Sequence, residues 1–233
     1  MEMNSGLLKN IARIAGVLYL FLIITGVFGV MYIPSQIIVP GDSISTAKNI
    51  ISNELLFRIG VLNDIISNTI FLFLVLVLYR LLKSVNEHQA KIMFALVIVQ
   101  IPFVFIMEAF NITTLMILKG DILKTFELNQ RQDLAMLFTE INNYGTLSLE
   151  MFWGLWLLPF GLLVYKSEFI PRIFGILLLA GGFAYIIDST IGILFPGYSS
   201  FVKYPTLLLV AIGEISITLW LIIKGIKIKE IKV

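Results

Sequence analysis

Five carboxylates lie inside otherwise apolar stretches of the chain, where an ionisable side chain is costly. Each comes from a different stretch: Asp64, Glu108, Glu150, Asp188 and Glu214. An acid that faces lipid costs roughly 2.5–3.5 kcal/mol, so we expect all five to face the interior of a helix bundle or a wet cavity. At ~1.5 Å rise per residue, all five fall between the helix midpoints and about 8 Å on the outer side. Their common depth predicts one polar layer within the bundle.

Such a layer has the chemistry to hold a cation, a proton or a small polar solute. Carboxylate, amide and carbonyl oxygens suit hard cations such as Mg²⁺, Ca²⁺, Mn²⁺ or Na⁺. Asn68 lies one helical turn after Asp64. Asn111 shares a helix face with Glu108. The five acids, these two asparagines and Arg58 are therefore the candidate ligand-binding residues. No catalytic residue and no particular metal is predicted.

Charge balance limits the state of these acids. Arg58 is the only basic residue expected within their reach, and Glu54 competes for it from four residues earlier. Five carboxylates and one guanidinium cannot all be ionised and dry together, so either some acids are protonated or water or a bound cation compensates them. The alternative is structural: the acids only form hydrogen bonds with Asn, Tyr and Trp partners across helices and lock the bundle.

The elements that must position these residues are membrane-spanning helices. Of the 233 residues, 58% are hydrophobic and 14% are charged, whereas soluble domains average ~45–50% and ~25%. This composition excludes a water-soluble globule. A bilayer core about 30 Å thick needs roughly 20 apolar helical residues. Six stretches meet that requirement: Ile11–Ile33, Leu55–Leu82, Ile92–Leu118, Thr146–Tyr165, Ile173–Phe195 and Thr206–Ile223. The predicted fold is an all-α, polytopic membrane bundle.

Two longer polar connections are expected to carry short interfacial helices on the outer side. Pro34–Glu54 begins with turn residues, and Asp42 there has the features of an N-cap before apolar residues at helical spacing. Gly120–Tyr144 is expected to hold another surface helix that leads into the fourth span. The other connections are short, which favours antiparallel neighbours. We therefore predict a single domain, residues 1–233, with six transmembrane helices in one bundle.

Basic residues predict the orientation in the membrane. With the N-terminus inside, eleven Lys and Arg residues lie on the inner side and six on the outer side, so the positive-inside rule places both termini in the cytoplasm. The first span is too long for a secretory signal and no small-x-small cleavage site follows it, so we expect it to remain in the mature protein. The expected location is the cell membrane, with the lipid bilayer as partner.

Composition also excludes several classes of site. The chain has no cysteine and one histidine, His88, so disulfides, iron–sulfur clusters, haem and zinc sites lack their ligands. A net charge of +2 gives no basic footprint for nucleic acid. Phosphate-binding loops, metalloprotease motifs and nucleophile elbows are absent from the sequence. A hard cation is the one cofactor class that the available ligands suit.

The fragment Ile-x-Arg-Ile-x-Gly occurs twice, at Ile11–Gly16 and at Ile170–Gly175. Inverted repeats would relate the first and fourth spans, whereas these fragments belong to the first and fifth. Both lie at helix starts, where Arg reaches the headgroups and Gly admits a close neighbour. We therefore expect a close helix contact at each glycine and no internal duplication.

Segments throughout the chain resemble one family of bacterial and archaeal membrane proteins. The resembling segments are Ala12–Gly16, Val39–Asp42, Leu56–Gly60, Leu78–Lys83, Phe152–Pro159, Ser167–Gly175 and Gly213–Leu221. They are similar to the domain-of-unknown-function 4386 family. The resemblance implies a prokaryotic multi-spanning membrane protein with a single bundle domain. It implies no catalytic residue, because the family has no established activity.

The favoured function is non-enzymatic: the protein binds or passes a cation, a proton or a small polar solute through an outward-facing pocket lined by the five acids. One alternative is an intramembrane enzyme that modifies lipids, with paired carboxylates as general acid and base or as ligands of a hard metal. A second alternative is a purely structural membrane subunit. Convergence of the acids favours binding, whereas two acids beside a groove open to lipid favour the enzyme.

Overall fold

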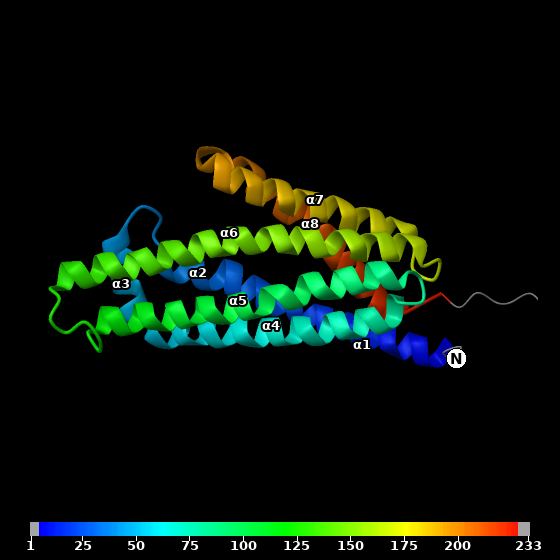
Figure 1. Ribbon diagram of the computed structural model, residues 1–233, viewed down its shortest axis with the longest axis horizontal. Helices are drawn as coiled ribbons and strands as arrows, with labels where there is room; N and C mark the ends of the chain where they lie inside the picture. Colours follow the sequence, from blue (N-terminus) through cyan, green and yellow to red (C-terminus); the bar gives the residue numbers. More distant parts are fainter. Residues whose placement is uncertain (1–4, 228–233) are drawn as a thin grey trace, which may run out of the picture. The chain divides into compact units, whose positions relative to one another are not determined.

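The computed structural model describes residues 5–227, and every regular element within that range is helical. Figure 1 shows these elements in chain order. They are α1 (Ser5–Val27), the π-helical segment η1 (Phe28–Tyr32), α2 (Ile33–Ile37), α3 (Ser43–Ser52), α4 (Glu54–Leu82), α5 (Glu87–Lys119), α6 (Leu128–Lys166), α7 (Arg172–Leu194), the 3₁₀ turn η2 (Pro196–Tyr198) and α8 (Ser199–Ile223). The predicted all-α class is confirmed.

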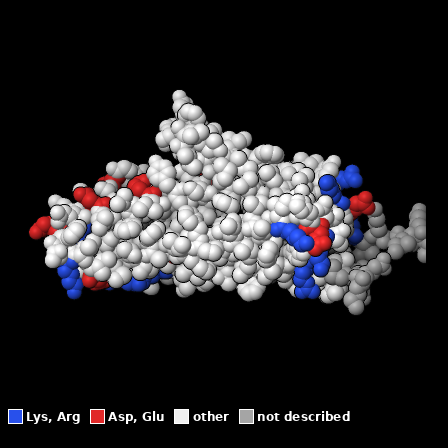
Figure 2. Space-filling model, in the orientation of Figure 1, with Lys and Arg blue, Asp and Glu red and all other residues white. Residues whose placement is uncertain are grey.

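Within residues 5–227, six helical segments are long and apolar enough to cross a bilayer, as predicted. They are Gly6–Ile37, Glu54–Leu82, Glu87–Lys119, Leu128–Lys166, Arg172–Leu194 and Phe201–Ile223. Their most apolar windows have mean hydropathies of 1.7 to 2.4. On the face drawn in Figure 2, most of the surface carries no charged side chain. Exposed apolar surface on this scale marks a contact with lipid, so this is a multi-pass membrane protein.

The first span is longer than predicted. Phe28–Tyr32 winds as a π-helix, and α2 continues the helical path to Ile37. Pro34 therefore lies inside the span instead of beginning the connection. It occupies the first turn of α2, directly after the π-helical segment. Short π-helical segments inside α-helices occur frequently at functional sites.

The first predicted interfacial helix is present as α3. Asp42 caps it, because its Oδ1 accepts a hydrogen bond from Ser45 N at 2.9 Å and its Oδ2 accepts one from Ser45 Oγ at 2.6 Å. Asn49 Nδ2 donates to the Ile37 carbonyl at 3.1 Å and joins α3 to α2. The second predicted segment is also helical, but it forms the first turns of α6. Residues 128–144 contain neither Gly nor Pro, so nothing interrupts that helix.

The chain divides into two compact units. Unit 1 comprises the residues up to Phe21, Ile70–Gln100 and the residues from Leu147 onward; unit 2 comprises Leu22–Thr69 and Ile101–Thr146. Helices α1, α4, α5 and α6 each contribute residues to both units. The single domain expected for residues 1–233 stays a prediction.

Unit 2 has an apolar core that joins four helices. The core consists of Ile33 and Ile37 of α2, Ala47 and Ile50 of α3, Leu115, Ile117 and Leu118 of α5, and Ala135 of α6. Each of these side chains is less than one-tenth exposed. Van der Waals packing of this kind is a main force between helices in membranes. It fixes the short helices α2 and α3 against α5 and α6.

Unit 1 brings α6 and α7 together through glycines. Gly154 and Gly161 of α6 lie seven residues apart, and the same spacing separates the α7 residues Gly175 and Gly182. A Cβ placed on Gly154 would lie 2.5 Å from the Gly182 carbonyl oxygen. One placed on Gly175 would lie 2.7 Å from the Gly161 carbonyl oxygen. The two backbones are therefore in direct contact at two points, the close approach that small residues permit in membranes.

Helix α8 packs on two partners within unit 1. It runs beside α7 (Figure 1), and a Cβ on Gly213 would lie 3.1 Å from the Leu177 carbonyl oxygen. On α1, a Cβ on Gly16 would lie 2.8 Å from Ile222 N. Gly16 and Gly175 end the two copies of the repeated fragment. The close helix contacts predicted at both glycines are confirmed.

Replacing Gly154 with Val is expected to destabilise the protein, because the new side chain would overlap the backbone of α7. Overpacking typically costs about 1–3 kcal/mol. The thermal unfolding midpoint in detergent, followed by circular dichroism, measures this loss. Gly26→Val in α1 is the matched control, since no neighbouring group lies within 4 Å of a Cβ there. Equal shifts in the two variants would contradict the close packing of α6 and α7.

Hydrogen bonds from the hydroxyl and N–H of Ser45 lower the pKa of Asp42 below its ordinary value. A carboxylate with a depressed folded-state pKa stabilises the fold above its unfolded pKa of about 3.9 and loses that contribution as the pH falls through the folded value. We expect an NMR titration of the Asp42 carboxyl carbon to have its midpoint below about 3.9. Ser45→Ala should raise the midpoint, and an unchanged midpoint would contradict the cap.

Candidate functional site: a polar pocket in unit 2

Unit 2 contains a pocket with a volume of about 110 Å³. Its polar side chains are Thr46 of α3, Asp64 of α4, Asn111 of α5, and Thr139, Asn142 and Asn143 of α6. Isoleucines of α2 and α3, with Phe57 and Val61 of α4, form its apolar wall. A cavity of ~150 Å³ can hold benzene, so this pocket fits a solute of about four or five non-hydrogen atoms.

Asp64 is held at the pocket wall by its neighbours on α4 and η1. Asn63 Nδ2 donates to Asp64 Oδ1 at 3.1 Å and to the Thr25 carbonyl oxygen at 2.9 Å. A Cβ on Gly29 of η1 would overlap Asp64 Oδ1 and lie 2.7 Å from Asn63 Nδ2. Glycine at this position therefore leaves the space that the carboxyl group occupies.

A second acid reaches the pocket through two amides. Asn111 Nδ2 donates to Glu108 Oε2 at 3.0 Å, and Asn142 Nδ2 donates to Asn111 Oδ1 at 3.1 Å. Glu108 itself is only 5% exposed, whereas both asparagines line the pocket. We name this chain of hydrogen bonds from Asn142 through Asn111 to Glu108 the amide relay. It links α5 to α6 and orients polar groups at the wall.

The pocket wall can carry negative charge but no positive charge. Among the residues that line the pocket, Asp64 is the only ionisable side chain. Asp64 and Glu108 are also within electrostatic reach of each other. With no basic group on the wall to attract an anion, the pocket suits a cation or a neutral hydrogen-bond donor.

The other three acids lie in unit 1. Glu150 and Asp188 are within electrostatic reach of each other, and Lys203 of α8 attracts both. Glu150 Oε2 is buried and has no hydrogen-bond partner in the described part of the chain. The Tyr19 hydroxyl lies near the Glu214 carboxyl without reaching hydrogen-bond geometry. Tyr19, Tyr185 and Lys203 are therefore among the neighbours of these acids.

The predicted five-acid layer is thus distributed as two acids in unit 2 and three in unit 1. A single layer of all five stays a prediction. Between residues 5 and 227, no group of three or more His, Cys, Asp or Glu side chains is placed to hold one metal ion. The amide of Asn68, which is expected beside the Asp64 carboxyl, donates to the Asp64 backbone carbonyl at 2.9 Å.

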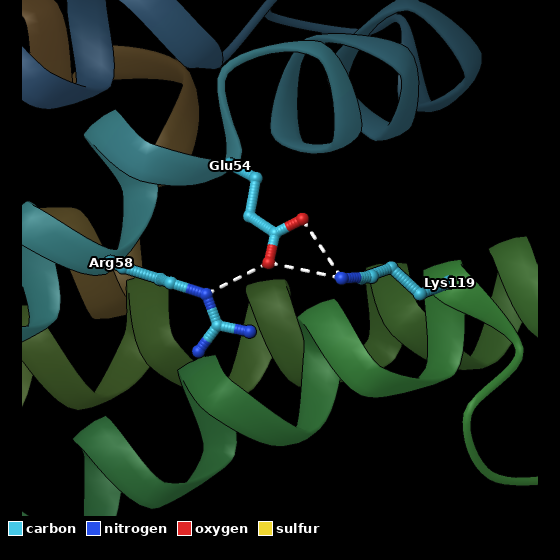
Figure 3. Close-up of polar contacts among 3 residues, drawn as sticks. All are labelled: Glu54, Arg58 and Lys119. Atoms are coloured by element: carbon cyan, nitrogen blue, oxygen red, sulfur yellow. Dashed lines mark hydrogen bonds and ion pairs between the residues drawn. The ribbon is translucent and has the colours of Figure 1, made fainter.

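Arg58 is engaged by Glu54, the competing partner. Arg58 Nε lies 2.9 Å from Glu54 Oε1, and Lys119 Nζ lies 2.9 and 3.0 Å from the two Glu54 oxygens (Figure 3). This ion network ties the start of α4 to the end of α5. The expectation that Arg58 is the only basic residue within reach of the acids is wrong, because Lys203 interacts with Glu150 and Asp188.

Sequence reasoning misses several residues of the pocket. Asn142 lies one turn before Thr146, so helical periodicity would have found it if α6 had been expected to begin at Leu128. Gly29 and Thr46 carry no sequence signal, since their part in the pocket depends on contacts between elements. Lys203 lies in a segment expected to be a connection, and the structure places it on α8.

Comparison with known proteins adds a family but no activity. A family model described as "Domain of unknown function (DUF4386)" matches residues 14–225. A protein of Archaeoglobus fulgidus described as uncharacterised is 36% identical over 89 residues, which cover 38% of this chain and 51% of the relative. The chain thus spans about half the length of that curated relative. No solved structure matches the chain.

Asn111→Leu is expected to destabilise the protein, because it removes the donor to Glu108 and leaves a buried carboxyl without that partner. An unsatisfied buried polar group costs about 1–3 kcal/mol. Unfolding of the purified protein in detergent measures the change.

Thr113→Val is the matched control, since Thr113 is on the same helix and its hydroxyl donates only to the carbonyl of Ala109, four residues earlier. The double variant Glu108→Leu, Asn111→Leu should recover part of the loss, because both partners are then apolar. A loss in Asn111→Leu no greater than in the control would contradict the amide relay.

Proposed function

The chain belongs to the domain-of-unknown-function 4386 family, and we propose that it binds or passes a cation, a proton or a small polar solute through the unit 2 pocket. The supporting observation is the position of Asp64, an acid from an apolar helix that lines a space large enough for a small solute. An ionisable residue within a membrane segment is a functional-site hypothesis by default. The pocket supplies the ligand space which that hypothesis needs.

We further propose that the protein lies in the cell membrane with both termini in the cytoplasm. The excess of eleven inner over six outer basic residues supports this orientation. In this topology the α2–α3 and α5–α6 connections are on the outer side. Unit 2 contains both connections, so the pocket would take up its ligand from outside the cell.

One observation favours a second candidate, an intramembrane enzyme that acts on lipid. Glu150 and Asp188 form a carboxylate pair within electrostatic reach, and Glu150 Oε2 is buried without a hydrogen-bond partner in the described residues. A pair of this kind suits general acid–base catalysis. A lipid product formed by the purified protein in phospholipid vesicles, and abolished by Glu150→Gln, would be its signature. A structural subunit would show neither binding nor turnover.

The binding proposal is tested by thermal unfolding in detergent with rising concentrations of four probes: sodium chloride, calcium chloride, acetamide and propylammonium chloride. A solute that binds only the folded state stabilises it by mass action, by about 2.7 kcal/mol when the solute concentration is 100 times its Kd. The unfolding midpoint therefore rises with solute concentration. We expect at least one probe to raise the midpoint of the wild type. Asp64→Asn should abolish that rise.

Asp188→Asn is the matched control, because this acid belongs to unit 1 and does not line the pocket. It should keep the rise seen with the wild type. The proposal fails if no probe stabilises the wild type, or if Asp64→Asn responds as the wild type does.

A further inference from the structure

The chemistry of the pocket wall points to one class of ligand. Building on the proposed binding function, we infer that the unit 2 pocket takes a short protonated alkylamine. The Asp64 carboxylate is the counter-ion of its ammonium group. The apolar wall covers its alkyl chain.

The polar groups of the wall match an ammonium group. Asp64 Oδ1 accepts one hydrogen bond, from Asn63 at 3.1 Å, and a carboxylate has about four lone-pair sites. An ammonium group brings three N–H donors and no acceptor. Asn142 and Asn143 add amide groups to the same wall. The pocket therefore offers one anionic acceptor with neutral polar groups beside it, and no basic side chain opposes a cation.

The apolar part of the wall favours an alkylamine over an inorganic ion as the ligand. Na⁺ and Ca²⁺ need oxygen ligands on most sides, from protein or from water. Here Ile37, Ile50 and Val61 line the same space, and their carbon atoms neither coordinate an ion nor bond its water. They do cover methyl and methylene groups. Phe57 adds an aromatic ring, a group that attracts organic cations.

The volume limits the length of the ligand. The pocket, at about 110 Å³, is smaller than the ~150 Å³ cavity that holds benzene. Propylammonium, with three carbons and one nitrogen, fits this space with its charge at Asp64. A ligand of this size binds weakly even at its best, so its Kd is expected in the roughly millimolar range.

The test is calorimetric titration of the full-length protein in detergent with propylammonium chloride. The buffer is potassium phosphate at about pH 7, where alkylamines are protonated as lysine is. Each of three comparison probes lacks one feature of propylammonium. 1-Propanol has the alkyl chain without the charge, sodium chloride has the charge without the chain, and tetramethylammonium chloride has no N–H donor. We expect saturable binding of propylammonium that is at least tenfold tighter than binding of any comparison probe.

Two variants connect that binding to the pocket. Asp64→Asn should weaken propylammonium binding at least tenfold, which is about 1.4 kcal/mol, while Asp121→Asn, at an exposed acid in the α5–α6 connection that does not line the pocket, leaves it unchanged. Val61→Ile adds one methylene to the apolar wall. This variant should weaken binding of propylammonium about threefold or more relative to binding of methylammonium. The shorter methylammonium does not reach the part of the pocket that the variant narrows.

The outcomes separate this inference from the function on which it rests. Asp64-dependent binding of sodium or propanol without binding of propylammonium would overturn the amine and leave the proposed function standing. Binding of propylammonium that Asp64→Asn and Val61→Ile both leave unchanged would also overturn the inference. Absence of Asp64-dependent binding for every probe would overturn both.

Discussion

A polar group inside a membrane helix must find its partners within the protein, and unit 2 is organised by this constraint. Water is scarce in the bilayer core, so an unmatched carboxyl group there is costly. Asp64 is matched by Asn63, whose amide also reaches the Thr25 carbonyl of α1. The carboxyl group also needs space beside η1, and Gly29 leaves that space. One acid thus determines which residue is tolerated on another helix, at the place where the helix winds as η1.

The acids of the two units have chemically different neighbours. In unit 2, Glu108 accepts a hydrogen bond from Asn111, and Asn111 accepts one from Asn142. In unit 1, Glu150, Asp188 and Glu214 have as neighbours Tyr185, Tyr19 and a lysine. Amides can both donate and accept, so one amide of unit 2 can bridge an acid and a second amide. Unit 1 instead has helices in backbone contact at Gly154 and Gly182.

Local patterns in the sequence predict much of this fold. Span number follows from hydropathy and length, the α3 cap from Asp42, and the close helix contacts from the glycines of the repeated fragment. The sequence signal for each of these features lies within a short stretch of the chain. The Glu54–Arg58 pair is also local, and Glu54 is recognisable as a competing partner. Lys119, the third member of that network, lies 65 residues from Glu54, so only the packing of α4 on α5 brings it there.

The pocket itself could not be predicted, because spacing gives only its local contacts, such as Asn111 with Glu108, and not those between helices, such as Asn142 with Asn111. Two candidate residues from the sequence line it, Asp64 and Asn111. Asn142, which bonds Asn111, and Thr46 come from segments that the sequence places in connections. The expected grouping by depth along the helices considers only the axial position of each acid. Which acids meet depends on the rotation of each helix, and that is set by the packing of its neighbours.

The short elements of unit 2 form part of the pocket wall. Thr46 of α3 lines the pocket, and its hydroxyl oxygen accepts a hydrogen bond from Val39 N at 3.0 Å. Asn49 of α3 donates to the Ile37 carbonyl. Exposed ion pairs such as Glu54 with Arg58 contribute only ~0.2–1 kcal/mol, so the apolar core of α2, α3, α5 and α6 must carry most of the stability. The pocket wall combines Ile33, Ile37 and Ile50 of this core with the asparagines of the amide relay, so the packing of the core also positions those polar groups.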